Sequence, residues 1–366
     1  MKKANLVGIV GGGIFGCLTA IELANNGFDV QIYEKSSEIF TGATSNTQNR
    51  LHLGLHYPRD HETAVQSRLG FQDFIERFPT TVRLDFPNYY GVAKQNSKVS
   101  TQNFQSFAKK AGIEIFRVEL EDALLPPYDK SRIDSLWQCN EGVIDISLLK
   151  LQILHELEIS GVEVIFNTEI TTIEIEDGIF ELTTSESEKY RKNFLVRATY
   201  GLDRIQSASL KMRSKKYEFH RTLILEANLV SPPFGFTVID GDFFTILPKG
   251  FSGKYLFYGP SICVLEKSIG YLAPEEWSKI DYSDEFLRAE NCLISRIQDW
   301  MPNLQIESSN KWNTTIRTIL PNVSATDKRV SRLLVQDERY VDLWSGKIDH
   351  SVEIARQTLN YFKSQT

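Results

Sequence analysis

The chain has 366 residues, of which 42% are hydrophobic and 24% are charged, so it holds enough apolar material for a large core and lacks the composition of a disordered chain. Its net charge of −6 excludes nucleic-acid binding as a main role, because phosphate backbones require a basic surface. The four cysteines are widely scattered and form no C-x-x-C pair, which argues against a disulfide framework or a zinc site and favours a reducing cytoplasm.

The start of the chain, Met1-Lys2-Lys3 followed by an apolar run, superficially resembles a signal peptide. Glycines and Glu22 interrupt the run, so we expect no cleavage there. No stretch of the sequence reaches the length of a membrane span. We therefore expect a cytoplasmic protein without a transmembrane segment, either free or attached peripherally to a membrane.

The N-terminal segment predicts a strand, a turn, a helix and a second strand. Residues 6–10 form a short apolar run that is typical of a buried parallel strand, and residues 15–25 carry the apolar positions of a helix packed on a sheet. The pair Asn26-Gly27 ends this helix, and residues 28–33 predict the second strand.

The turn between the first strand and the helix carries Gly11, Gly13 and Gly16, which fit the pattern G-x-G-x-x-G. In dinucleotide-binding proteins such glycines allow a tight turn, a close backbone approach to a pyrophosphate and close packing of helix on strand. The phosphates then meet free amides at the helix N-terminus. Glu34 ends the second strand at the spacing of the acid that binds the adenosine ribose. The pattern indicates a bound dinucleotide but does not distinguish NAD from FAD.

The remaining chain alternates between helical and strand-like segments. Helices are expected at 62–78, 146–159, 285–300 and 349–362, and strands at 162–166, 195–199, 222–229, 243–247, 254–258 and 340–343. Residues 170–184 predict a hairpin, because Asp177-Gly178 is a strong turn signal. The order of these segments is α/β, then more antiparallel, then α/β again, which indicates a discontinuous domain with an inserted lobe.

The loop at residues 41–58 carries a resemblance that selects FAD. It reads TGATSNTQNRLHLGLHYP and resembles the D-amino-acid oxidase-like superfamily of FAD-dependent oxidoreductases. It is most similar to the L-2-hydroxyglutarate oxidase and dehydrogenase branch, where the loop has the form T-G-x-x-S followed by H-x-G-x-Y-Y. His52, Gly54 and Tyr57 match that form, and His56 replaces its first tyrosine.

Further segments resemble the superfamily in the same order along the chain. Residues 141–145 precede a helix, and residues 161–168 resemble the strand near the adenine. Residues 198–202, ATYGL, resemble A-T-G-x-W with Tyr200 inserted, and residues 344–348, WSGKI, resemble the C-terminal turn that brings a helix start to the flavin.

The resemblance implies non-covalent FAD, since no cysteine corresponds to the covalent attachment site of sarcosine oxidases. It assigns FAD contacts to residues of the segments just described, namely Gly11, Gly13, Ile14, Phe15, Gly16, Glu34, Lys35, Thr44, Ser45, Asn49, Leu51, His52, Ala198, Thr199, Gly201, Ser345, Gly346, Lys347 and Ile348.

The fold expected from this resemblance and from the order of segments is α/β. We expect a Rossmann-like FAD-binding domain built from residues 1–85, 140–212 and 316–366. A largely antiparallel β-sheet substrate-binding domain, built from residues 86–139 and 213–315, is inserted in it. The flavin is expected between the two domains, where small-molecule sites often lie.

The family reaction is oxidation at a carbon that bears nitrogen or oxygen, often beside a carboxylate, with hydride passing to flavin N5 and then to O2 or a quinone. Residues 315–321, TIRTILP, resemble the family segment G-x-R-P, so Arg317 is the first candidate for holding a substrate carboxylate. The alternative is an arginine that forms a surface ion pair.

His52 and His56 are candidates for accepting a proton, and they favour a hydroxy acid, which must lose its hydroxyl proton as the C–H bond breaks. The alternative is that they pack against FAD or bind it by hydrogen bonds. A metal site is not expected, because Gly54 and Pro58 prevent the helix that a His-x-x-x-His pair requires. The aromatic residues at 243–248 and 255–258 either line the substrate cavity or belong to the core.

The leading function is oxidation of a small hydroxy acid or amino acid. Three alternatives stay open at this point: an FAD-dependent amine or amino-sugar oxidase of a biosynthetic pathway, an NAD-linked dehydrogenase, and a flavin-binding subunit without turnover.

Overall fold

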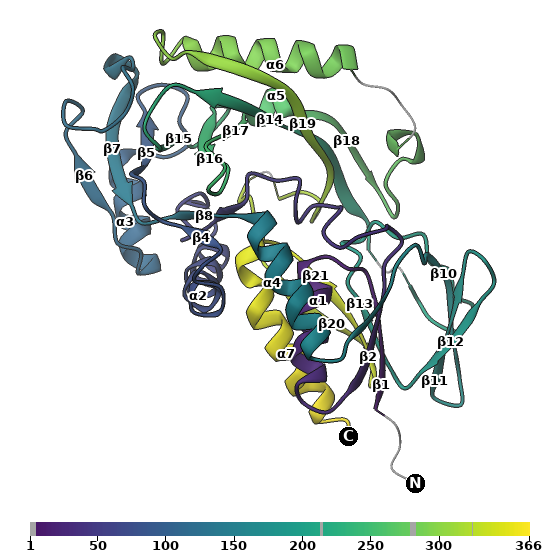
Figure 1. Cartoon of the computed structure of the whole chain (residues 1–366). Helices are drawn as coiled ribbons and strands as arrows, with labels where there is room; N and C mark the ends of the chain where they lie inside the picture. The colour runs from purple at the N-terminus through teal and green to yellow at the C-terminus, as the bar shows by residue number, and fades with distance from the viewer. Residues whose placement is uncertain (1–4, 213–214, 279–282, 324) are drawn as a thin grey trace.

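The computed structural model describes residues 5–212, 215–278, 283–323 and 325–366. Figure 1 shows a parallel sheet with its helices at one end of the molecule and a larger sheet at the other. The larger sheet is antiparallel except for one strand pair. The expected fold, α/β with a second and largely antiparallel sheet, is confirmed.

The parallel sheet has six strands. Their order is β20 (Arg332–Asp337), β21 (Tyr340–Trp344), β13 (Phe194–Arg197), β1 (Leu6–Val10), β2 (Asp29–Tyr33) and β9 (Glu163–Ile165). Neighbouring strands run parallel except β20 and β21. The interior position of β1 explains its continuous apolar sequence, because a strand in the middle of a parallel sheet is covered on both faces.

Three helices pack together beside this sheet: α1 (Ile14–Ala24), α4 (Ile146–Ile159) and α7 (Ser351–Lys363), with α1 in contact with both others. The α4 helix begins where the sequence predicts, because the Asp145 side chain accepts hydrogen bonds from the amides of Ser147 and Leu148. The last helix begins later than predicted. Residues Ile348–His350 form a separate 3-10 turn, η3, and α7 follows it.

The large sheet extends over much of the second half of the chain. Its order is β18 (Val264–Gly270), β14 (Tyr217–Leu229), β17 (Tyr255–Tyr258), β16 (Thr245–Pro248), β15 (Gly235–Ile239), β5 (Asn88–Ala93), β7 (Ile133–Cys139) and β6 (Phe116–Val118), with β19 (Ile306–Ile319) paired to β14. Two helices, α5 (Pro260–Cys263) and α6 (Ser283–Gln298), contribute to the core of this sheet, and α3 (Thr101–Ala111) packs near β5 and β7.

The sequence analysis missed β19, a strand of 14 residues. Its sequence, IESSNKWNTTIRTI, is too polar to stand out as a strand. Backbone pairing with β14 nevertheless holds it over nearly its full length, and the pairing sets Arg317 opposite His220. The expected strand at 243–247 is shifted, because Phe243 and Phe244 precede β16.

The remaining elements are the strands of two three-stranded sheets, together with one helix and two 3-10 turns. They are β3 (Arg50–Leu51), α2 (His61–Arg77), β4 (Val82–Arg83), η1 (Lys130–Arg132), β8 (Gly142–Ile144), β10 (Ile170–Glu176), β11 (Ile179–Thr184), β12 (Lys189–Lys192) and η2 (Glu275–Ser278). The strand orders of these two sheets are β10-β11-β12 and β3-β8-β4. The hairpin expected at Asp177-Gly178 is confirmed between β10 and β11, and both turn residues have positive φ.

The limits of the two domains remain a prediction. One strand crosses an expected limit, since β19 begins in the segment assigned to the substrate-binding domain and ends in the segment assigned to the FAD-binding domain.

Candidate active site

A cavity of about 820 Å³ lies where the two large sheets approach each other. On one side it is lined by residues that follow the carboxyl ends of β1, β2, β13 and β21, the edge at which α/β sheets bind ligands. On the other side it is lined by residues of β14, β15, β17 and β19. The cavity therefore lies between the carboxyl-end edge of the parallel sheet, where nucleotides commonly bind, and the large sheet.

The glycines of the first turn have separate structural roles. A Cβ atom at Gly16 would lie 2.0 Å from the Gly11 carbonyl oxygen, so only glycine lets α1 pack this closely on the turn. A Cβ at Gly13 would meet only the Thr44 hydroxyl, at 3.5 Å. Gly13 thus borders open space at the N-terminus of α1, where the N-cap residue has no side chain and the Ile14 amide donates a hydrogen bond to the Thr44 hydroxyl at 3.2 Å.

Glu34 anchors the same turn. Its carboxylate accepts hydrogen bonds from the amides of Gly12, at 2.7 Å, and Ser36, at 2.9 Å. The residue is only 7% exposed, yet it lines the cavity. A carboxylate has about four acceptor positions, so two remain for hydroxyl groups of a ligand.

Replacing Glu34 with alanine is expected to weaken FAD retention by about 1–3 kcal/mol, since a charged hydrogen-bond acceptor is lost. Fluorescence of flavin released on dilution measures this. The matched control is Glu38→Ala, an acid four residues away whose side chain is 62% exposed and outside the cavity lining. Equal retention in the two variants would contradict a ribose contact for Glu34.

Most residues assigned to FAD from the sequence line this one cavity: Gly11, Gly13, Ile14, Phe15, Glu34, Lys35, Thr44, Asn49, His52, Ala198, Thr199, Ser345, Gly346, Lys347 and Ile348. The other four, Gly16, Ser45, Leu51 and Gly201, lie outside its lining. Gly16 and Leu51 are buried behind it, so a structural role suits them better than direct contact.

The C-terminal turn is fixed against the segment that precedes β20. A Cβ at Gly346 would lie 1.8 Å from the Arg329 carbonyl oxygen. The Ser331 hydroxyl accepts a hydrogen bond from the Gly346 amide at 2.7 Å and lies 2.9 Å from His350 Nδ1. These contacts hold the residues before η3 at the cavity wall.

The sequence analysis did not single out Arg50, which lines the cavity and is almost fully buried. Its guanidinium pairs with Glu141 at 3.1 Å and donates hydrogen bonds to the hydroxyls of Tyr90 and Thr237. Glu141 also accepts from the Leu53 amide at 2.7 Å. This buried pair, the Arg50–Glu141 pair, ties the loop at residues 41–58 to β5 and β15.

His52, His56 and Tyr57 form a compact ring cluster, with centroids 5.4–5.8 Å apart. Burial lowers the pKa of both histidines well below the ordinary value, and the charges of Lys347 and Arg50 lower it further. Both imidazoles are therefore neutral at pH 7. Among the residues that the structure describes, no three His, Cys, Asp or Glu side chains gather as a metal site would require.

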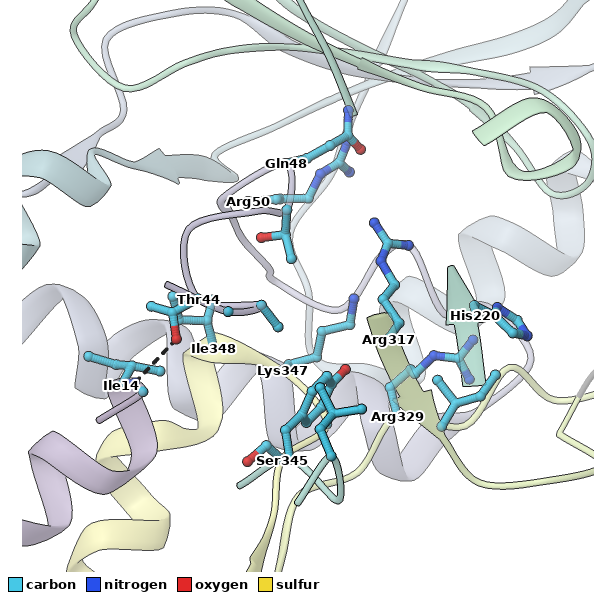
Figure 2. Close-up of a pocket in the computed structure, with 18 of the residues that line it drawn as sticks. Ile14, Thr44, Gln48, Arg50, His220, Arg317, Arg329, Ser345, Lys347 and Ile348 are labelled. Carbon is cyan, nitrogen blue, oxygen red and sulfur yellow. Dashed lines mark hydrogen bonds between the residues drawn. The ribbon is translucent and has the colours of Figure 1, made fainter. Parts of the chain in front are cut away.

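Arg317 enters the cavity from β19, with its guanidinium carbon 4.5 Å from the Tyr258 ring centroid. Within the described part of the chain, no carboxylate pairs with it, whereas nearby Arg329 pairs with Asp327. Figure 2 shows the Arg317 and Lys347 side chains extending toward one space, which Gln48 and Arg50 border from the other side.

The aromatic residues divide between the two roles left open by the sequence. Tyr258 lines the cavity beside Arg317, whereas Phe243 and Phe244 line the cavity and also belong to the core of the large sheet. Tyr255 and Phe257, on the same strand as Tyr258, belong to the core of the large sheet.

Two curated relatives match parts of the chain. The FAD-dependent monooxygenase FPY4 of Fusarium mangiferae is 36% identical over 107 residues, which is 29% of each chain. The FAD-dependent monooxygenase kojA of Aspergillus flavus is 43% identical over 76 residues, 21% of this chain and 18% of the relative. The chain thus spans less than a third of the length of either relative.

Solved structures match over nearly the full length. The glycine oxidase from Geobacillus kaustophilus has a TM-score of 0.73 at 14% identity, covering 98% of this chain and 94% of that one. The L-alpha-glycerophosphate oxidase from Mycoplasma pneumoniae, with FAD bound, has a TM-score of 0.76 at 16% identity, with coverage of 98% and 94%. At these identities the likeness shows a common fold.

No helix of the described residues combines the length and the apolar character needed to cross a bilayer. Residues 7–336 match the family described as FAD dependent oxidoreductase, DAO, which is nearly the whole chain. FAD is therefore the cofactor, in place of the NAD-linked alternative, and the chain is an enzyme. By its fold and by this match, the chain belongs to the DAO family of FAD-dependent oxidoreductases.

Proposed function

We propose that the protein oxidises a small substrate that carries a carboxylate, at the neighbouring carbon bearing a hydroxyl or amino group. The observation that carries this proposal is Arg317, a guanidinium directed into the cavity without a carboxylate partner among the described residues. The planar fork of arginine binds a carboxylate through two parallel hydrogen bonds. An anionic substrate group would supply the partner that the protein does not.

The cavity suits FAD on two grounds. The space beside Gly13 accommodates a pyrophosphate at the N-terminus of α1, and Glu34 retains acceptor positions for a ribose. In this proposal the loop at residues 44–52 and the turn at residues 345–348 hold the flavin end. When bound, FAD supplies the acceptor for the substrate hydride.

The proposed division of labour follows from the charges. Arg317 binds and orients the carboxylate. The imidazoles of His52 and His56 and the buried amine of Lys347 line the same cavity, and they are the candidates for accepting the proton that leaves the hydroxyl or amino group. Neutral bases at the site favour a hydroxy acid over an amino acid, because an amino acid can lose its extra proton before it is oxidised.

An anaerobic panel tests the proposal by bleaching of the flavin absorbance. Each 2-hydroxy acid or 2-amino acid is paired with its carboxamide, which keeps the size and removes the charge. Bleaching by an acid and not by its amide is the expected result. Bleaching by neutral amines or amino sugars alone would contradict the carboxylate and favour the amine-oxidase alternative. Reoxidation of the reduced flavin by O2 or by a quinone then identifies the electron acceptor. We propose that it is one of these two.

A further inference from the structure

The Lys347 side chain has an unusual environment for a lysine. Its Nζ atom lies 3.3 Å from His52 Nε2 and 4.7 Å from the Tyr57 ring centroid. It lines the cavity, and Figure 2 shows it extending toward the same space as Arg317. In the described ranges of the chain, no carboxylate lies within ion-pair distance of it. Its nearest polar neighbour is thus an imidazole.

Charged groups face Lys347 from every element around it. The charged groups are Arg317 of β19, Asp327 and Arg329 of the segment before β20, and Asp349 of η3, and the neutral imidazoles of His52 and His56 face it from the loop at residues 41–58. Burial and the nearby charges of Arg329 and Arg317 together lower the pKa of Lys347 to about 7. The carboxylates of Asp349 and Asp327 oppose this shift only in part. In a large share of the molecules Lys347 is therefore a neutral amine at neutral pH, with a lone pair that can accept a proton.

His52 is less available to a substrate than Lys347. Its Nε2 atom faces the Lys347 amine, and its Nδ1 atom is buried without a hydrogen-bond partner, 3.9 Å from Glu141 Oε1. Both of its nitrogens are thus turned toward the protein. Glu141 lies on the Nδ1 side of the ring, and with the ring proton on Nδ1 the Nε2 atom accepts a hydrogen bond from the Lys347 amine.

We propose that Lys347 is the catalytic base and that His52 is a positioning residue that holds the Lys347 amine at the substrate. The inference rests on the proposed function. As the hydride leaves the substrate carbon with the C–H electron pair for FAD, the O–H or N–H bond breaks and its proton adds to the Nζ lone pair. The electrons of that bond form the C=O or C=N bond, and Lys347 is left as an ammonium that later releases its proton to water.

The pH dependence of wild-type flavin reduction, at saturating substrate, tests the assignment without any substitution. The rate is expected to rise with pH, with a midpoint near 7, and to level off above it, because only the neutral amine accepts a proton. If an imidazole were the base, the midpoint would lie well below 6.5, since both histidines have lowered pKa values. A midpoint in that lower range would overturn the proposal.

Lys347→Ala is expected to slow flavin reduction about 10²–10⁴-fold with FAD still bound. Added methylamine or ethylamine should restore part of the rate, and a stronger base should restore more, which a purely structural loss would not allow. Lys347→Met, which keeps the apolar stem, should be equally slow. Lys130→Ala, at a lysine whose side chain is 44% exposed and lies outside the cavity lining, is the control and should keep the rate and the midpoint.

His52→Asn separates positioning from catalysis. It should displace the midpoint of the pH profile while the Lys347 amine still accepts the proton. A full rate in Lys347→Ala together with a loss in His52→Asn or His56→Asn would assign the base to that imidazole and overturn the proposal.

Failure of the proposed function gives a different pattern. In that case no carboxylate substrate bleaches the wild-type flavin. The visible spectrum of the oxidised holoenzyme, titrated through neutral pH, still reports the ionisation of Lys347. A step near pH 7 that disappears in Lys347→Met supports a neutral amine at the flavin, and the lack of any such step overturns it.

Discussion

Replacing Arg317 with alanine is expected to raise the apparent Kd of the carboxylate substrate by roughly thirtyfold to several thousandfold, with FAD still bound. Truncating one partner of a buried charge pair costs about 2–5 kcal/mol, and each 1.4 kcal/mol is about a factor of ten. Because no carboxylate of the described chain pairs with Arg317, its removal leaves no protein anion unpaired, and thermal stability should change little. The rate of flavin reduction as a function of substrate concentration gives the apparent Kd.

Two further variants sharpen this experiment. Arg317→Lys keeps the charge but loses the fork, so its affinity should fall between those of wild type and Arg317→Ala. Arg332→Ala, at an arginine of β20 whose side chain is 54% exposed, should bind substrate as wild type does. If Arg317→Ala loses FAD and its substrate affinity is unchanged after FAD is restored, Arg317 is a cofactor ligand. That outcome would contradict its proposed role in binding the substrate carboxylate.

Gly13→Val is expected to fold and to purify without flavin colour. In the protein alone, a side chain at this position has room, since its nearest contact is the Thr44 hydroxyl at 3.5 Å. The pyrophosphate of FAD needs that room, so the variant should collide with the cofactor and not with the chain. The ratio of flavin to protein absorbance measures the loss, and circular dichroism checks the fold.

Gly16→Val provides the contrast within the same turn. Its Cβ would lie 2.0 Å from the Gly11 carbonyl oxygen, so the helix must move away from the turn and the variant should be insoluble or greatly destabilised. A yellow Gly13→Val protein would show that the phosphates bind elsewhere. A stable and colourless Gly16→Val protein would show that the two glycines do not divide the roles in this way.

Local patterns in the sequence predict the parts of the fold that depend on near neighbours. The run of β1, the glycine turn, α1 and β2 follows from apolar spacing and turn residues, and α4 has the predicted bounds, with Asp145 capping its start and Ser160 at its end. The family resemblance adds the cofactor. The polar strand β19 is different: it depends on pairing with β14 across a long stretch of intervening chain, which leaves no local signal.

In the candidate site, too, contacts between distant parts of the chain leave no local signal in the sequence. The sequence points to Arg317, His52 and Lys347 separately, but the contact between His52 and Lys347 joins residues 295 positions apart. The pairing of Arg50 with Glu141 joins two other distant segments, so Arg50 is inconspicuous in the sequence. Proximity of this kind determines which groups are neutral and which are charged, and no spacing rule gives it. The roles of these residues remain predictions until the variants are measured.

The strand order of the parallel sheet has a consequence for how the enzyme acquires its cofactor during synthesis. The glycine turn leaves the ribosome first, yet β1 lies beside β13, which lies beside β21, and the turn at Gly346 follows β21. The surroundings of the Arg50–Glu141 pair are likewise incomplete until β15 is synthesised, because Arg50 donates a hydrogen bond to Thr237 of β15. A nascent chain that already displays the whole dinucleotide fingerprint therefore still lacks most of the walls of its pocket. We therefore expect FAD to bind only after β21 and the Gly346 turn have been synthesised, and truncated chains to accumulate as apoprotein however intact their N-terminal motif is.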